Sequence, residues 1–419
     1  MTRARCAAPR ALLLIPALLL PFPAHAGEEA PVLPLDAAVA EALRVNPEVQ
    51  AAEHAWRAAA HIPKQVSGLD DPTLSYESWN TPNAFTFDRA ESNLYSVGQK
   101  IPFPGKLGLR GKAARLSAEA EEQRFAQKRL EVAAKVTAAY ADLFQAERDL
   151  EIVLRYRELA RALADSARAR YEAGEAAQQD VIQADLARTR LETELNDLDE
   201  TRTGALARLN ALLDRPQASA ARASADLPVK PIAVPVEALE RRATEQRPAV
   251  RAASLEVDRA ETERRLARRR YLPDFEVRGS RWVNRGADDG YGAMLVVNVP
   301  WVWRGKHDAA NAEARERARG AQAMLRSERN VAAGGVRELY ARVDRARRNV
   351  DLVRTALLPQ ARLAFESSLA GYGVGENDFP SVLDTFEGLL YLETQAVDEV
   401  AAFHRSRAGL EEMVGEPIP

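Results

Sequence analysis

The feature that most constrains this chain is an internal repeat that covers most of its length. Landmark residues of the first half return in the second half in the same order. The pairs that lie 201 positions apart are Pro47 and Pro248, Pro72 and Pro273, Tyr171 and Tyr372, Gly174 and Gly375, and Pro216 and Pro417. Proline, glycine and tyrosine carry this match, so it does not merely reflect the likeness of one alanine-rich helix to another. The chain is therefore predicted to be one structural unit used twice.

Each copy carries the same patterns in the same order. An amphipathic helix is expected first, over about 35–65 in copy one and about 236–270 in copy two. Alternating polar and apolar residues with a polar turn in their middle then predict a β-hairpin in each copy, at 72–104 and at 272–303. Two long helices complete each copy, and their expected bounds are 106–172 and 178–213 in copy one, and 306–371 and 380–413 in copy two.

These boundaries divide the chain into four parts. We expect a signal peptide at 1–26, repeat 1 at 27–215, a linker at 216–235 and repeat 2 at 236–419. The linker is assigned from its alanine, serine and proline content, because three prolines between positions 228 and 235 interrupt regular structure.

The long helices are a second strong constraint. Residues 112–173 contain neither glycine nor proline, so about 93 Å of uninterrupted helix is allowed at about 1.5 Å per residue. Apolar residues recur there at spacings of three, four and seven, which is typical of a coiled-coil stripe. Such a helix needs packing along its length, and the return helix of each copy is its expected antiparallel partner. In copy two, Pro359 is expected to kink the corresponding helix.

The N-terminus has the pattern of an export signal. Arginines precede an apolar run at 11–20, and Ala24-His25-Ala26 offers the small residues that a signal peptidase recognises. Cleavage after Ala26 would remove Cys6, the single cysteine, so neither an N-terminal lipoprotein nor a disulfide is expected. The net charge of −3 lacks the basic excess of nucleic-acid-binding proteins, so no nucleic-acid partner is expected.

Aromatic residues are concentrated in the two predicted hairpins, which hold four of the five tryptophans. Strands of about 9–11 residues with alternating apolar and polar side chains, flanked by aromatic residues, are typical of outer-membrane barrels. The sequence after residue 26 contains no apolar run of about 18 residues, the length that a membrane-spanning helix requires. For either hairpin alone, an ordinary hairpin packed on helices is an equal alternative, because it also favours aromatic residues.

Four strands are too few to enclose a channel, so a barrel requires several chains. Three chains would supply a 12-stranded barrel in outer-membrane lipid and a tunnel of twelve long helices. The expected fold is therefore mainly α with a β-barrel portion: long antiparallel coiled-coil helices plus two β-hairpins per chain, assembled as a homotrimer.

These motifs resemble those of a known family. The twofold repeat, the Asn-Pro pair at 46–47, and the turns Tyr-Glu-Ala-Gly at 171–174 and Tyr-Gly-Val-Gly at 372–375 resemble the TolC-like outer-membrane factors of tripartite efflux systems. Residues 99–107, Gln-Lys-Ile-Pro-Phe-Pro-Gly-Lys-Leu, resemble the heavy-metal efflux (CusC- and CzcC-like) branch. The resemblance implies a passive conduit in the outer membrane of a Gram-negative bacterium, with a large periplasmic portion. Its implied partners are a periplasmic adaptor and an inner-membrane transporter of the resistance-nodulation-division type.

The resemblance also implies a constriction at the periplasmic tip, ringed by acidic residues after the second turn. The matching positions are Ser381 and Asp384, with Glu376 and Asp378 nearby, and Asp180 and Asp185 in copy one. In the family the first position is usually acidic, so the serine at 381 departs from the pattern. A carboxylate ring from three chains would favour cations in a narrow neck. For Asp180 a role at the helix start is an equal alternative, whereas Asp384 lies a turn further into its helix.

The turns themselves carry a second implication. Gly174 and Gly375 are expected to adopt a positive φ at a helix end, whether or not a partner docks there. A role of these turns, with Tyr171 and Tyr372, in contacting the adaptor is implied by the resemblance alone.

Two other functions compete with the conduit. A periplasmic coiled-coil scaffold or adaptor would share the signal and the helices, but not the repeated aromatic hairpins. A secreted enzyme would need a nucleophile–histidine pair, a phosphate loop or a cluster of ligands, and the sequence shows none of these patterns. The histidines after residue 26 show no metal-binding spacing, so neither a metal site nor a cofactor is expected.

Overall fold

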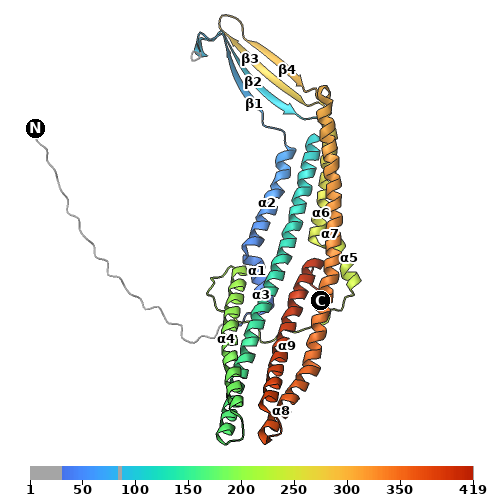
Figure 1. The fold of residues 1–419 in the computed structure, drawn as a ribbon. Coiled ribbons are helices and arrows are strands. Elements are labelled where there is room, and N and C mark those ends of the chain that lie inside the picture. Colours follow the sequence, from blue (N-terminus) through green and yellow to red (C-terminus); the bar gives the residue numbers. More distant parts are fainter. Residues whose placement is uncertain (1–30, 84–86, 419) are drawn as a thin grey trace, which may run out of the picture.

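The computed structural model describes residues 31–83 and 87–418, and it is a long, narrow molecule (Figure 1). A β-sheet lies at one end, and two helix-to-helix turns lie at the other end. The expected signal peptide lies outside the described residues.

Copy one and copy two contain corresponding elements. Copy one comprises α1 (Leu35–Val45), α2 (Pro47–Ser67), β1 (Thr73–Trp79), the 3-10 turn η1 (Phe87–Arg89), β2 (Ser92–Ile101), α3 (Lys106–Glu172) and α4 (Gln178–Leu212). Copy two comprises α5 (Val236–Gln246), α6 (Pro248–Arg269), β3 (Phe275–Asn284), β4 (Gly290–Val297), the 3-10 turn η2 (Pro300–Trp303), α7 (Arg304–Leu352), the π-helical turn η3 (Val353–Leu357), α8 (Leu358–Val374) and α9 (Phe379–Val414). The two hairpins and the long helices predicted from the sequence are therefore present.

The expectation of a single first helix in each copy was wrong, because that helix is broken before its proline. Asn46 is extended (φ −62°, ψ 127°), as the ring of Pro47 requires of the residue before it. The Asn46 side chain caps α2 by accepting a hydrogen bond from the Glu48 N–H at 2.9 Å. Its Nδ2 donates to the Leu212 carbonyl at 2.9 Å and ties this break to the end of α4. The same break recurs before Pro248, without a side-chain cap.

The four strands form one antiparallel sheet in the order β1-β2-β3-β4, so the hairpins of the two copies join along β2 and β3. The register gives the sheet two unlike faces. Side chains on one face are mainly apolar and exposed: Leu74, Tyr76, Val97, Val277, Tyr291 and Leu295. The other face carries serines and the Glu276–Arg278 ion pair.

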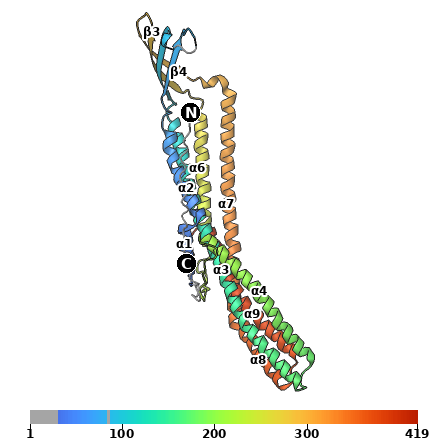
Figure 2. The ribbon, with the colours of Figure 1, turned by 90° about the vertical axis from the view of Figure 1, so that its left-hand side faces the viewer.

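The helices form an open, curved layer with α3 in its middle (Figures 1 and 2). On one side α3 packs against α2 in its upper half and α4 in its lower half, and on the other side against α6 and α9. Beyond these lies α7, which packs on α6 and α9. The layer therefore ends in two unlike edges, α2 with α4 on one side and α7 on the other.

Lys106, in the Pro-Phe-Pro-Gly-Lys passage from β2 to α3, joins the sheet to the helices. Its side chain is buried, and its Nζ donates to the Leu272 carbonyl and to Asp274 Oδ1, both at 2.8 Å. The Phe103 N–H donates to the same carboxylate oxygen at 2.7 Å. This passage of copy one is thereby fixed to the residues that precede β3 in copy two.

Copy two holds one extra residue in its long helix. Up to the first residue of the π-helical turn, buried positions of the two copies lie 200 apart, as in Val136 and Val336, Leu143 and Val343, and Val153 and Val353. Below it they lie 201 apart, as in Ala164 and Phe365, and Ala167 and Ser368. The turn at 353–357 absorbs the difference. It also precedes Pro359, so the irregularity expected at this proline occurs a turn earlier, as π-helix.

Among the described residues, none of the helices has a stretch long and apolar enough to cross a bilayer.

Candidate functional site at the two tip turns

The two turns at the end opposite the sheet, residues 173–177 and 375–378, are called here the tip turns. Both contain a glycine in the left-handed region, Gly174 at φ 79° and Gly375 at φ 78°. In each, the N–H of the following glutamate donates to a carbonyl five residues back, from Glu175 to Arg170 and from Glu376 to Gly371, at 2.8 Å. A Cβ atom would meet nothing at Gly174 and only Arg170 Nη2, at 3.8 Å, at Gly375, so the positive φ rather than crowding requires glycine.

The tyrosines that precede the tip turns have different surroundings. Tyr171 is 46% exposed, whereas Tyr372 is 5% exposed and packs edge-on against Phe379 with ring centroids 5.5 Å apart. The Tyr372 hydroxyl is buried and finds no hydrogen-bond partner among the described residues. Burial and the nearby Asp180 carboxylate raise the pKa of Tyr372, and Arg170 opposes them. The structure therefore brings Asp180 of α4 close to Tyr372 of α8.

Arg170, which sequence reasoning missed, connects the two tip turns. Its guanidinium donates to the Tyr372 carbonyl and lies over the Tyr372 ring, 4.6 Å from the centroid. Its Nε is 3.9 Å from the Glu175 carboxylate. One arginine of α3 thus holds the end of α8. A signal was present in the sequence, because the position 201 residues later is Gly371, where the repeat fails to match.

Asp378 and Ser381 form the N-terminal cap of α9. The Asp378 carboxylate accepts hydrogen bonds from the Ser381 hydroxyl and from the Ser381 N–H at 3.1 Å. These bonds lower the pKa of Asp378. The serine that departs from the family pattern is therefore a donor to a neighbouring acid, and the structure gives both residues a role in starting the helix.

The other acidic residues of the predicted constriction lie apart from this cap. Asp384 and Glu376 are exposed and make no ion pair with any residue that the structure describes. Asp180 is half-buried in the first turn of α4, where its charge complements the helix dipole. Asp185, one turn further, pairs with Arg168 at 3.3 Å and Arg188 at 3.7 Å. Of the predicted constriction residues on α9, Asp384 is thus an exposed acid without an ion pair to any described residue.

Metal-ligating side chains do not gather here. Within the ranges 31–83 and 87–418, no group of three or more His, Cys, Asp or Glu residues is arranged to hold a metal ion.

The sequence matches the family model of the outer membrane efflux protein over residues 38–215 and 239–416, which are the two copies. The chain belongs to this family. The resemblance to TolC-like channels is thereby confirmed at family level, and the function is that of an outer-membrane efflux channel, not of an enzyme. A periplasmic scaffold, the alternative left open above, is not what this family model describes. A search of curated proteins found no match.

Solved channel structures share the fold. VceC from Vibrio cholerae is 17% identical, with a TM-score of 0.78 over 92% of this chain and 97% of that chain. The CmeC outer membrane channel of Campylobacter jejuni is 16% identical, with a TM-score of 0.79 over 92% and 86%. CusC, from a study of transmembrane channel formation, is 16% identical, with a TM-score of 0.77 over 91% and 92%. Since these scores are alike, the fold does not separate the branches of the family.

Proposed function

We propose that three copies of this chain form the outer-membrane conduit of a tripartite efflux system, supplied by an inner-membrane transporter of the resistance-nodulation-division type through a periplasmic adaptor. The observation that carries the proposal is that the helical layer of this elongated chain ends in two unlike edges, α2 with α4 on one side and α7 on the other. Edges that differ within one chain can join head to tail, and a rotation that closes makes a ring.

The charges and strands support head-to-tail closure. β1 and β4 each pair with one strand only, so β4 of one chain can accept β1 of the next. Acidic side chains outnumber basic ones on α4, and the reverse holds on α7. Across the seam, α4 would meet only the lower part of α7, together with α8, so the complementary charges would act along that stretch.

The sheet has the properties of a membrane-spanning one. β2 and β3 contain 10 residues each, about 33 Å at 3.3 Å per residue, which suffices to cross the apolar core of a bilayer. The exposed apolar face, with Leu74 (81% exposed) and Leu295 (63% exposed), would meet lipid. The polar face would line the lumen.

The tip turns would form the closed end of the tunnel. Three Asp384 carboxylates brought together near the axis would concentrate negative potential and favour cations. Tyr171, exposed beside Gly174, and the second tip turn with Gly375 would contact the adaptor from outside.

Heavy-metal cations are the cargo that we propose, on the resemblance of residues 99–107 and on the cation preference of such a neck. Lys106, the most distinctive residue of that motif, is engaged in the joint between sheet and helices. The structural role of Lys106 leaves this residue no part in binding cargo, so the motif supports the proposal only through its resemblance to that branch.

Fractionation and conductance of the reconstituted protein test the proposal. We expect recovery in the outer-membrane fraction as a heat-modifiable trimer whose channels prefer cations. Asp384→Asn should raise the conductance and weaken the cation preference, whereas Asp165→Asn, an equal charge change on the exposed surface of α3, should change neither. Recovery as a soluble periplasmic monomer would contradict the conduit, and an unchanged Asp384→Asn channel would remove Asp384 from the constriction.

A further inference from the structure

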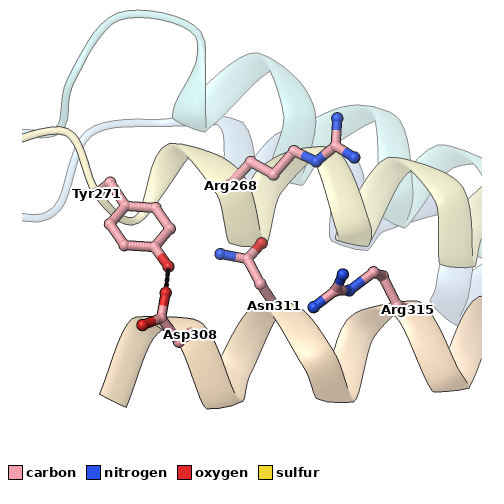
Figure 3. A pocket seen from close by; sticks show the side chains of 5 residues that line it. All are labelled: Arg268, Tyr271, Asp308, Asn311 and Arg315. Atoms are coloured by element: carbon pink, nitrogen blue, oxygen red, sulfur yellow. Dashed lines mark hydrogen bonds between the residues drawn. The ribbon is translucent and has the colours of Figure 1, made fainter. Parts of the chain in front are cut away.

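A cavity of about 350 Å³ lies where α6 ends and α7 begins (Figure 3), at the end of the molecule that carries the sheet (Figure 1). It is lined by Arg268, Tyr271, Asp308, Asn311 and Arg315. Asp308, Asn311 and Arg315 project from α7 toward α6, which carries Arg268 (Figure 3). The cavity lies at the other end of the molecule from the tip turns, and the proposed conduit does not require it.

The polar groups of this cavity are only partly engaged. Asp308 accepts a hydrogen bond from the Tyr271 hydroxyl, and Asn311 Nδ2 donates to the His307 carbonyl at 3.1 Å. The guanidinium groups of Arg268 and Arg315 make neither an ion pair nor a hydrogen bond with any part of the chain that the structure describes. Two guanidinium groups from facing helices therefore remain available to an anion, beside one carboxylate that is already hydrogen-bonded.

Copy one closes the equivalent place. Ser67 corresponds to Arg268, and Gly108 and Gly111 correspond to Asp308 and Asn311. A Cβ atom on Gly111 would lie 3.0 Å from the Ser67 Cβ, so α2 and α3 are packed closely there. The cavity is thus a property of copy two alone, and the repeat fold does not require it.

The residues beside the cavity are of the kinds that favour a membrane surface. η2, between β4 and α7, exposes Trp301 (53%), Val302 (64%) and Trp303 (75%). Exposed Arg304 and Lys306 follow directly. Tryptophan rings favour the boundary between lipid and water, and basic residues beside them attract anionic headgroups.

We propose that this cavity binds the phosphate of an anionic phospholipid headgroup at the periplasmic surface of the membrane. Arg268 and Arg315 contact the phosphate from two sides, because guanidinium groups match phosphate oxygens in pairs. Trp301 and Trp303 lie against the lipid next to that headgroup. The site rests on the proposed position of the sheet in the outer membrane.

Spin-labelled lipids test the site in trimers reconstituted in phosphatidylcholine nanodiscs. We expect the wild-type trimer to prefer labelled phosphatidylglycerol over labelled phosphatidylcholine. Arg268→Gln and Arg315→Gln should each reduce this preference about fivefold. The matched control is Arg317→Gln with Arg319→Gln, since these α7 residues already pair with Glu313 and Glu316 at 2.6 and 2.7 Å. The control should keep the preference for phosphatidylglycerol. Its change in net charge equals that of the variant that combines Arg268→Gln and Arg315→Gln.

Other outcomes overturn the proposal. An unchanged preference in the Arg268→Gln and Arg315→Gln double variant would remove the site, and so would an equal loss in the control. Dissociation of the variant trimers would show that a neighbouring copy covers the cavity instead. If millimolar inorganic phosphate abolishes the preference, free phosphate rather than a headgroup is the ligand. A wild-type trimer that inserts without preferring phosphatidylglycerol overturns the site alone, whereas failure to insert overturns the proposed function as well.

Discussion

Copy one and copy two form the same elements in the same order, yet equivalent positions have different surroundings at three heights of the molecule. Near the sheet, Lys106 is buried against Asp274, whereas Lys306 is exposed and makes no ion pair with a described residue. At mid-length, Asp149 corresponds to Asn349, and at the tip Arg170 corresponds to Gly371. Lys106 and Arg170 of copy one fasten it to copy two, whereas Lys306 and Gly371 make no such link to a described residue of copy one. Equivalent positions of the repeat therefore take different roles even where the residue is the same.

The mid-length pair, Asp149 and Asn349, differs in whether the buried side chain has its hydrogen-bond partners. Asn349 Nδ2 donates to Glu399 Oε1 at 2.7 Å, so the amide is used. Asp149 is 9% exposed, and its Oδ1 has no hydrogen-bond partner among the described residues. Burial, with Asp398 nearby, raises the pKa of Asp149 to about 7. A carboxylate in copy one therefore costs stability where the amide of copy two does not.

The largest expected effect is at the joint near the sheet. Lys106→Met should destabilise the protein by about 2–3 kcal/mol, because the Asp274 carboxylate and the Leu272 carbonyl lose a charged donor. Lys306→Met, the same change at the equivalent exposed position, should stay within about 0.5 kcal/mol. Thermal unfolding of the purified protein measures both. Equal losses would mean that the burial of Lys106 does not distinguish the two copies.

An intermediate effect is expected from Asp149→Asn, which places the residue of copy two in copy one. The native state keeps a proton between pH 3.8 and about 7 that the unfolded chain releases, so stability falls as pH rises through this window. The variant should therefore equal wild type near pH 4 and exceed it by on the order of 2 kcal/mol near pH 8. Melting curves across pH measure this. The control Asp165→Asn, at an exposed position of α3, should show no such pH dependence. If Asp149→Asn raises the stability equally at every pH, the gain does not come from the titration of the Asp149 carboxyl group.

The smallest effect on stability is expected at the tip. Arg170→Met loses the hydrogen bond to the Tyr372 carbonyl and the contact with its ring, about 1 kcal/mol in all. Since this arginine holds the two tip turns together, the variant should also conduct more ions. Arg168→Met, which removes only an exposed pair with Asp185, is the control. If both variants conduct like wild type, the link between the turns does not hold the tunnel closed.

Much of the fold could be predicted because its signals are local. The stretch without glycine or proline indicated α3, and alternating residues indicated the strands. The break at Asn46 was missed although Pro47 was noted, because the amphipathic pattern continues across it. Of the site, the glycine turns follow from backbone preference. The Arg170 link and the Lys106–Asp274 pair join residues about 200 and 168 positions apart, and no local pattern reports such pairing.

The π-helical turn at 353–357 shows how the long helix of one copy can change in length by a residue. One residue added to an α-helix advances everything below it by about 1.5 Å and rotates it by about 100°. In copy two that residue is taken up within five positions, and the buried positions on both sides still correspond to those of copy one. Tyr372 and Gly375 therefore arrive at the same height as Tyr171 and Gly174. A π-helical turn can therefore take up an inserted residue within one of the long helices. The two copies can differ in length by a residue and still place their tip turns at the same level.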